Sequence, residues 1–155
     1  MYPHIRSVLL LMHTWAGYLQ EVQMGVAQYM AQRPEWLFRR MHPIPQMTKH
    51  LRTMKLDGVI AYVEPDYVQL LRQMAIPVVD ISNWMPQQHF PRVVPDDLAV
   101  GHLAARHYMD LGLKHFAVIA LQGVLFSGLR RDGFVQGLAK EGFAAEEFAE
   151  SSGLS

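Results

Sequence analysis

The feature that most constrains the fold of this chain is a repeated alternation between short apolar runs and longer stretches with helical spacing. The first run, Val8–Met12, contains no polar residue, which is typical of a strand buried on both faces of a parallel sheet. Between Tyr18 and Met30 the apolar residues recur at the spacing of an amphipathic helix. This alternation predicts a parallel sheet covered by helices.

The same pattern extends to residue 142 and predicts one α/β domain, a three-layer arrangement of a parallel sheet with helices on both faces. We expect the first strand to be central. The expected strands are Val8–Met12, Leu37–Arg40, Gly58–Tyr62, Val78–Ile81 and Phe116–Leu121. The expected helices include Leu98–Leu111, with Val100, Leu103, Ala104, His107 and Leu111 facing inward, and Arg130–Lys140. Residues 143–155 are acidic and rich in Ser and Ala, which predicts a frayed tail.

Composition excludes several classes of protein. The 14 basic and 14 acidic residues give zero net charge, so no basic field attracts the chain to nucleic acid or anionic lipid. The absence of cysteine excludes disulfides, thiolate metal sites and thiol nucleophiles. The apolar run near the N-terminus is too short to cross a bilayer. We therefore expect a cytoplasmic protein without membrane contact.

No sequence motif indicates catalysis. The chain has no Gly-x-Ser-x-Gly elbow, no Gly-x-Gly-x-x-Gly after the first strand and no Walker Gly-Lys-Ser/Thr. The first strand is followed by His13-Thr14-Trp15, whose side chains are too bulky for a phosphate to approach the backbone. The eight histidines never have His-x-x-x-His spacing. We expect no enzyme activity, no cofactor and no metal.

Ligands of parallel α/β sheets bind at the carboxyl ends of the strands, which here lead into four loops. These loops are His13–Gly17, Ile81–Gln88, Pro95–Leu98 and Gln122–Arg130. They and their flanks carry many aromatic and charged side chains, namely His13, Trp15, Tyr18, Trp84, Asp96, Phe126 and Arg130. Aromatic rings pack on the C–H face of a sugar while charged groups bind its hydroxyls. We predict a sugar site, with Tyr18, Asp96, Phe126 and Arg130 opening onto one cleft.

Each candidate also has a purely structural interpretation. Asp96 could cap the helix at Leu98, a role compatible with ligand contact. Arg130 could be a solvated first-turn residue. Trp84 and Phe126 could pack against a further part of the protein, and Trp15 could cover the sheet edge.

Short motifs in the second half of the chain resemble the sugar-sensing domain of LacI/GalR-type regulators. Val94-x-Asp96 with Gly101 five residues on is similar to the family's opening of the ligand-proximal helix. Arg130-x-x-Gly133-Phe134 is similar to the motif whose arginine points into the effector pocket in that family. The resemblance spans about residues 5–142 and implies the first lobe of a type I periplasmic-binding-protein-like fold.

The variant that this chain resembles is the sensor of xylose-operon activators. Tyr18 and Gly25–Tyr29 are similar to the first helix of those sensors, although Gln20 stands where they usually carry an arginine. Phe126-Ser127 stands where they commonly carry Trp-Ser. The resemblance implies that residues 1–142 are the ligand-sensing lobe of a non-enzymatic transcriptional regulator, with a pentose as one candidate ligand.

Full-length regulators of this kind continue into a second lobe and, in the xylose-activator branch, an AraC-type helix-turn-helix domain. We therefore expect this chain to be a truncated product or one half of a split regulator, without specific DNA binding of its own. One alternative is an interaction module that forms a homodimer or pairs with a full-length regulator chain, through the sheet edge and the apolar loop around Trp84 and Phe90. Another is a small flavodoxin-like enzyme, which the absent phosphate loop disfavours.

Overall fold

The computed structural model describes residues 5–13, 17–44 and 47–151, and the chain divides into two compact units. Unit 1 comprises Met1–Ser82 and Gln88–Val93, and unit 2 comprises Asn83–Gln87 and Val94–Ser155. The backbone thus passes from one unit to the other after residues 82, 87 and 93. This division differs from the single domain predicted over residues 1–142, because the apolar alternation runs through both units without interruption.

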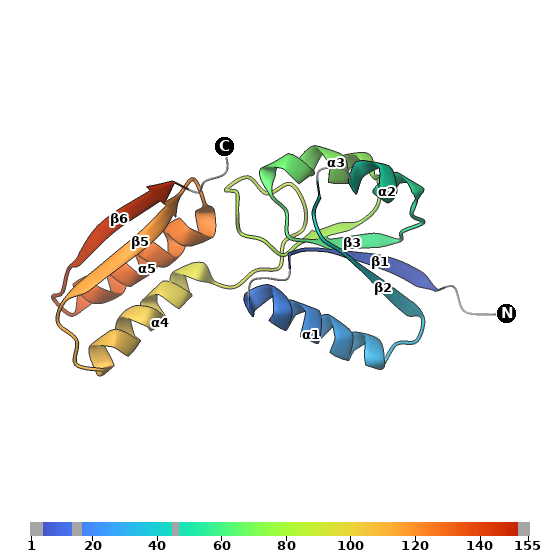
Figure 1. The fold of residues 1–155 in the computed structure, drawn as a ribbon. Coiled ribbons are helices and arrows are strands. Elements are labelled where there is room, and N and C mark those ends of the chain that lie inside the picture. The colour runs from blue at the N-terminus through green and yellow to red at the C-terminus, as the bar shows by residue number, and fades with distance from the viewer. Residues whose placement is uncertain (1–4, 14–16, 45–46, 152–155) are drawn as a thin grey trace. The chain divides into compact units, whose positions relative to one another are not determined.

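Unit 1 is built on a four-stranded parallel sheet in the order β2–β1–β3–β4. Its strands are β1 (Arg6–Leu11), β2 (Trp36–Met41), β3 (Gly58–Ala61) and β4 (Val78–Asp80). Helix α1 (Gly17–Ala31) lies on one face, and α2 (Met47–Thr53) and α3 (Val68–Gln73) lie on the other (Figure 1). The predicted α/β class, the three layers and the inner position of the first strand are confirmed in this unit.

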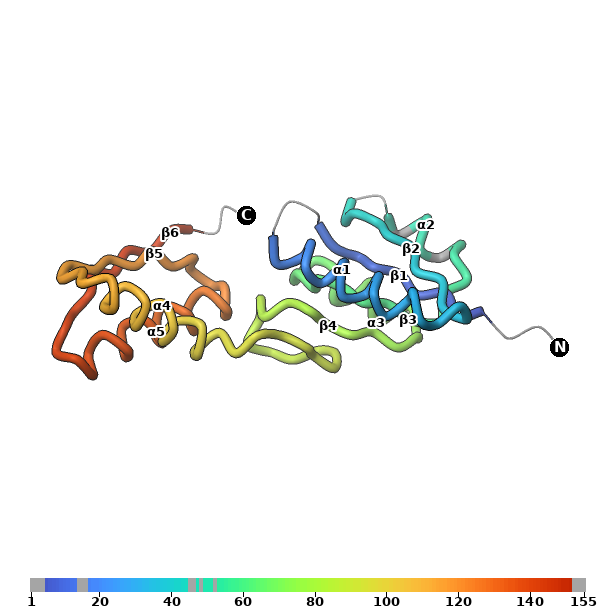
Figure 2. The backbone as a smooth tube through the Cα atoms, turned by 90° about the horizontal axis from the view of Figure 1, so that it is seen from below, coloured from blue at the N-terminus to red at the C-terminus, as the bar shows by residue number. Residues whose placement is uncertain are grey.

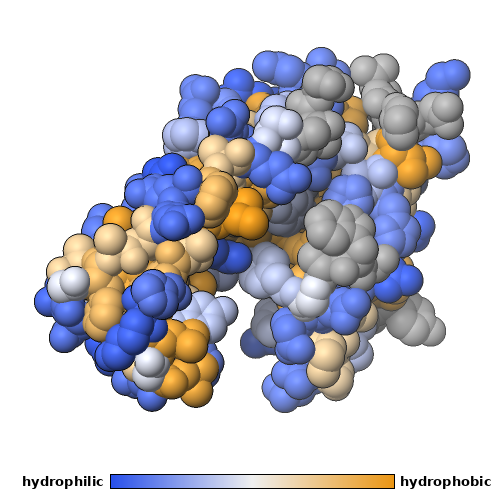
Figure 3. Space-filling view, turned by 60° about the vertical axis from the view of Figure 1, so that its left-hand side comes forward, coloured by the Kyte–Doolittle hydropathy of each residue, from blue (hydrophilic) through white to orange (hydrophobic). Residues whose placement is uncertain are grey.

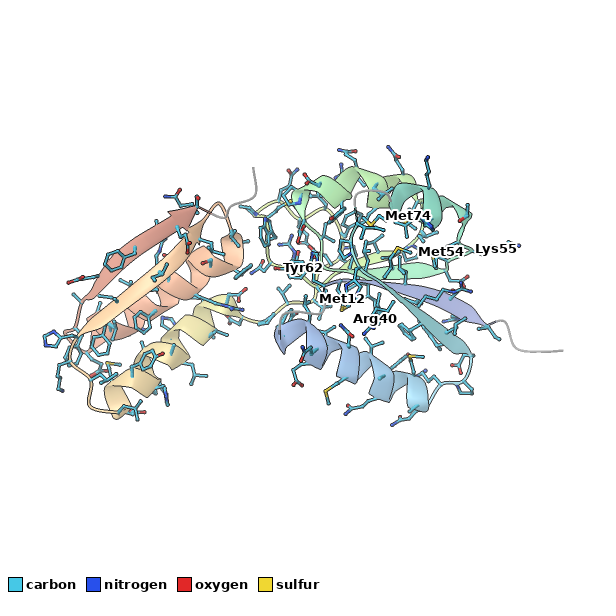
Figure 4. The ribbon with its side chains drawn as sticks, in the orientation of Figure 1. Met12, Arg40, Met54, Lys55, Tyr62 and Met74 are labelled. Atoms are coloured by element: carbon cyan, nitrogen blue, oxygen red, sulfur yellow. The ribbon has the colours of Figure 1, made fainter. Side chains whose placement is uncertain are left out.

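Apolar side chains fill both sides of the unit 1 sheet. Leu9 and Leu11 of β1 are fully buried, and so are Met47 and Leu51 of α2. On the α1 side, the buried cluster is Leu10, Met12, Leu19 and Ile81, with Tyr62 packed against it; Met12 and Tyr62 are labelled in Figure 4. An apolar strand without polar interruption therefore indicated correctly that β1 has partners on both faces.

Unit 2 combines a two-stranded parallel sheet with two helices. The strands are β5 (Phe116–Gln122) and β6 (Ala145–Ser151), and the helices are α4 (Asp97–Asp110) and α5 (Leu125–Lys140). Helices α4 and α5 lie side by side in both ribbon and tube views (Figures 1 and 2). The core of this unit consists of Ala105, Phe116, Phe134 and Leu138.

Strand β6 corrects the prediction of a frayed tail over 143–155. Its seven residues pair with β5 in register from Phe116↔Ala145 to Gln122↔Ser151. No apolar pattern marks this strand, because almost every side chain of β6 is exposed and backbone pairing does not depend on side-chain type. Residues 152–155 lie outside the described part of the chain.

Glycines allow α4 and α5 to approach each other backbone to backbone. A Cβ atom added at Gly101 would collide with the carbonyl oxygen of Arg130, and one at Gly133 would collide with that of Leu98. The buried stripe of α4 is consequently Asp97, Gly101 and Ala105. Of the predicted inward residues of this helix, Ala104 packs against the core, whereas His107 is exposed and Val100, Leu103 and Leu111 are 39%, 67% and 63% exposed. Only small residues fit where two backbones come this close.

Candidate ligand-binding site

Helix α5 begins before the point that the sequence predicted. It starts at Leu125 rather than Arg130, so Phe126 and Arg130 lie one turn apart on the same side of a helix. The N–H groups of Leu125 and Phe126 donate to the carbonyl oxygens of Trp84 and Asn83, each at 2.8 Å. The first N–H groups of a helix need partners from outside it, and here an earlier segment of chain supplies them.

This arrangement brings three predicted site residues together in unit 2. The rings of Trp84 and Phe126 meet edge to face, with centroids 6.0 Å apart. The guanidinium of Arg130 lies over the Phe126 ring, with Cζ 5.2 Å from the centroid. The aromatic side chains are half-buried, whereas the Arg130 side chain is 45% exposed. An aromatic surface beside an exposed guanidinium can offer packing to C–H groups and donors to hydroxyls.

A buried carboxylate that the sequence analysis missed holds this arginine. Asp97 is 1% exposed, and its Oδ1 accepts a hydrogen bond from Nε of Arg130 at 2.7 Å. Its Oδ2 accepts from Nδ2 of Asn83 at 2.7 Å. The close contacts of Gly101 with the Arg130 backbone and of Gly133 with the Leu98 backbone hold α4 near α5. They thereby keep the Asp97 carboxylate within reach of the Arg130 guanidinium. The spacing Asp97-x-x-x-Gly101 places both residues on one helix face, and this was the sequence feature that could have predicted the burial of Asp97.

The neighbouring acidic residue, Asp96, has a different place. It is exposed, and its Oδ1 accepts from the backbone N–H of Ala99 at 3.0 Å, which confirms the predicted helix cap. Its predicted contact with a ligand stays a prediction. Of two adjacent carboxylates, one therefore caps α4 from the solvent side and the other is buried against α5.

A shallow hollow borders the Arg130 side chain within unit 2. Its volume is about 420 Å³, and its lining includes Tyr108 of α4, Ile119 of β5, and Phe126 and Ser127 of α5. Pockets that hold small ligands measure roughly 300–1,000 Å³. The hollow is therefore large enough for a small ligand that also reaches Arg130.

The other two predicted residues, His13 and Tyr18, belong to unit 1. Nε2 of His13 lies 3.3 Å from Oε1 of Glu64, so residues that follow β1 and β3 meet here. The hydroxyl of Tyr18 donates to the carbonyl oxygen of Ile81 at 3.1 Å and ties the first turn of α1 to the end of β4. A cleft shared by Tyr18 and the unit 2 residues stays a prediction, and Trp15 lies outside the described residues.

Near Glu64, the hydroxyl of Tyr67 is held in its neutral form. Burial raises its pKa above the ordinary value, and the negative charges of Glu64 and Asp66 raise it further. Tyr67 therefore remains a hydrogen-bond donor throughout the neutral pH range.

A second buried carboxylate, in unit 1, has the same chemistry as Asp97. Asp80 is 1% exposed and accepts from Nε of Arg92 at 3.0 Å. It also accepts from the N–H and the hydroxyl of Ser82, each at 2.8 Å. The side chain of Arg92 is only 11% exposed, so this network fixes the chain on either side of the 83–91 loop and has little access to a ligand.

The described part of the chain offers neither a metal site nor a membrane-spanning helix. Among these residues, no three His, Asp or Glu side chains are placed to hold a metal ion. No helix in the same part is long and apolar enough to cross a membrane.

Comparison with known proteins supports the fold. No protein-family model matches the chain. A curated relative, the xylose operon regulatory protein of Haemophilus influenzae, is 29% identical over 143 residues, which cover 86% of this chain and 37% of the relative. This chain thus spans little more than a third of that regulator.

Solved structures match more of the chain at lower identity. The cellobiose complex of the transcriptional regulator CelR is 17% identical with a TM-score of 0.77, over 97% of this chain and 53% of that one. A periplasmic binding protein/LacI transcriptional regulator from Alkaliphilus metalliredigens, complexed with D-xylulofuranose, is 15% identical with a TM-score of 0.67, over 97% and 58%. The chain therefore has the α/β fold shared by LacI-type regulators and periplasmic binding proteins.

Proposed function

We propose that this chain is the sugar-sensing part of a cytoplasmic transcriptional regulator similar to xylose-operon activators, and that it binds its ligand without catalysis. The observation that carries the proposal is the group formed by Trp84, Phe126 and Arg130, held in place by Asp97. Sugars need both an aromatic surface for their C–H groups and charged groups for their hydroxyls, and this group supplies both.

The similar proteins favour a sugar over other small ligands. One is a xylose operon regulator, and two solved structures contain cellobiose and D-xylulofuranose. D-Xylose is therefore the first sugar to test, since it gives the relative its name and another pentose, D-xylulofuranose, occurs in one of these structures. His13, Tyr18 and Asp96 are proposed as further ligand contacts from their places in the sequence.

Tryptophan fluorescence offers a direct test, because Trp84 belongs to the proposed site. Titration with D-xylose, D-xylulose and cellobiose should change the emission for at least one sugar. The Trp84→Phe variant should lose this change. The Trp36→Phe variant is the matched control and should keep it, because Trp36 lies in β2 of unit 1, stacked on Phe38.

Two results would contradict the proposal. One is the absence of any saturable change with the three sugars when isothermal calorimetry also detects no heat of binding. The other is a sugar response that disappears in Trp36→Phe and persists in Trp84→Phe, which would locate the ligand elsewhere.

Specific DNA binding is not part of the proposed role of this chain by itself. Zero net charge gives the chain no overall attraction to phosphates, so we expect only weak, salt-sensitive association with DNA. A mobility-shift titration in the presence of excess non-specific competitor tests this expectation. A sequence-specific complex that resists the competitor would contradict it.

A second candidate function is association with another protein chain, such as a second copy or a full-length regulator. The outward face of the β5–β6 sheet favours it, because the paired residues Ile119 and Phe148 are 69% and 52% exposed. Figure 3 shows hydrophobic patches, in orange, among the mostly hydrophilic surface of the molecule. Sedimentation at increasing concentration separates the candidates: association without sugar supports this one, and a sugar-binding monomer supports the first.

A further inference from the structure

The carboxylate of Asp97 holds two groups that belong to different parts of unit 2. Oδ1 accepts from Arg130 on α5, and Oδ2 accepts from Asn83. Asn83 is the first residue of unit 2 after the chain leaves unit 1 at Ser82. One buried side chain thus connects the proposed ligand contact with the segment in which the backbone passes between units.

The backbone of this segment is tied to the same site. The carbonyl oxygens of Asn83 and Trp84 accept from the first N–H groups of α5, and the Trp84 ring meets that of Phe126. A change in the position of Arg130 therefore reaches residues 83–84 by two routes, through the Asp97 carboxylate and through the start of α5. Coupling between sites is carried by contiguous contacts of this kind.

We propose that Asp97 is a positioning residue that couples occupation of Arg130 to the conformation of residues 83–87. This inference rests on the proposed sugar site, and it adds a role for a residue that need not touch the ligand. A ligand that draws the Arg130 guanidinium changes the hydrogen bond to Oδ1. The hydrogen bond between the same carboxylate and Asn83 then changes in strength, and the conformation of residues 83–87 changes with it.

Hydrogen exchange of the full chain tests the coupling without any ligand. Arg130→Ala should alter amide exchange in the peptide covering residues 83–87 by roughly two- to tenfold, since residues in one hydrogen-bond network are energetically coupled. In an Asp97→Ala background, the same Arg130→Ala change should have a clearly smaller effect on that peptide, because only the route through the start of α5 remains. Equal effects of Arg130→Ala in both backgrounds would overturn the proposal.

An exchange of side chains distinguishes coupling from a general structural role. Asp97→Asn keeps the shape of the side chain and one acceptor for Arg130, but it places an amide against the amide of Asn83. Adding Asn83→Asp restores a donor and an acceptor to the pair. The amide exchange rate at 83–87 should return toward the native rate in the Asn83→Asp/Asp97→Asn variant. If the double variant exchanges at the same rate as Asp97→Asn alone, the coupling is contradicted.

A sugar arm separates this inference from the proposed function. In the native chain, D-xylose or whichever sugar binds should slow exchange at 83–87. In Asn83→Ala the sugar should bind within about threefold of the native Kd and slow that peptide less, because only the route through the start of α5 remains. Binding without any protection of 83–87 in the native chain would overturn the coupling and leave the sugar site standing. Failure of every sugar to bind would overturn the sugar site, and the ligand-free experiment would then decide the coupling alone.

Discussion

Each unit holds a buried carboxylate paired with an arginine, and the two pairs differ in one respect. Asp80 and Asp97 are both 1% exposed. Asp80 also accepts a hydrogen bond from Ser82, and Asp97 accepts one from Asn83. The side chain of Arg92 is 11% exposed, whereas that of Arg130 is 45% exposed. Exposure of the cation therefore separates a pair that only stabilises the fold from a pair that can also meet a ligand.

The largest expected effect is on the stability of unit 1. Arg92→Ala should lower the free energy of unfolding by about 3–5 kcal/mol, because it leaves the Asp80 carboxylate buried without its cation. Arg130→Ala should lower it by only about 1.5 kcal/mol, since removal of a half-exposed side chain lets water reach Asp97. Urea unfolding followed by circular dichroism measures both. Equal losses would remove the distinction between the two pairs.

The helix contact that sets the Asp97–Arg130 distance should be the next most sensitive feature. Gly101→Ala should cost about 1–3 kcal/mol, because its methyl group collides with the Arg130 carbonyl and forces the helices apart. Gly128→Ala on α5 is the matched control, since a Cβ there meets nothing within 4 Å. It should be neutral or stabilise the protein by up to about 1 kcal/mol through helix propensity. Thermal unfolding of the two variants compares them, and a destabilised Gly128→Ala with a native-like Gly101→Ala would refute the close contact.

Small and similar effects are expected where a helix is tied to a strand end in each unit. Tyr18→Phe removes the hydrogen bond to Ile81, and Ser127→Ala removes the acceptor for the Leu121 N–H at 2.8 Å. Each should lower the free energy of unfolding by about 1 kcal/mol. Denaturation of the single and double variants should give additive losses, because the two bonds lie in different units. Strong non-additivity would show that the two hydrogen bonds are energetically coupled, contrary to their place in different units.

The predicted strands include the three whose side chains are mostly buried, β1, β3 and β4. All five were found within two residues of their predicted bounds. For β1, β3 and β4 the reason is that a short apolar run is typical of a strand covered on both faces of a parallel sheet. Strand β6 was missed because its residues, rich in Glu, Ala and Ser, are exposed while its backbone is paired. Backbone hydrogen bonds form whatever the side chains are, so they produce no sequence pattern.

Three members of the group around Arg130 could be named from the sequence, and its buried carboxylate could not. Trp84, Phe126 and Arg130 were found from residue type and loop position, and the structure brings them together. Asp97 was missed because an acid in the first turn of a helix is ordinarily solvated and favourable to the helix dipole. Its burial depends on the approach of α5 at Gly101, a contact between segments far apart in sequence.

Isothermal titration calorimetry with D-xylose tests the proposed sugar contact on the exposed side of the Asp97–Arg130 pair. Arg130→Ala should weaken binding by about 10- to 150-fold, which corresponds to roughly 1.5–3 kcal/mol for one hydrogen bond to a charged group. Arg92→Ala, measured at a temperature at which it remains folded, should bind with the native Kd. Native affinity in Arg130→Ala, or an equal loss of affinity in folded Arg92→Ala, would contradict a sugar contact at Arg130.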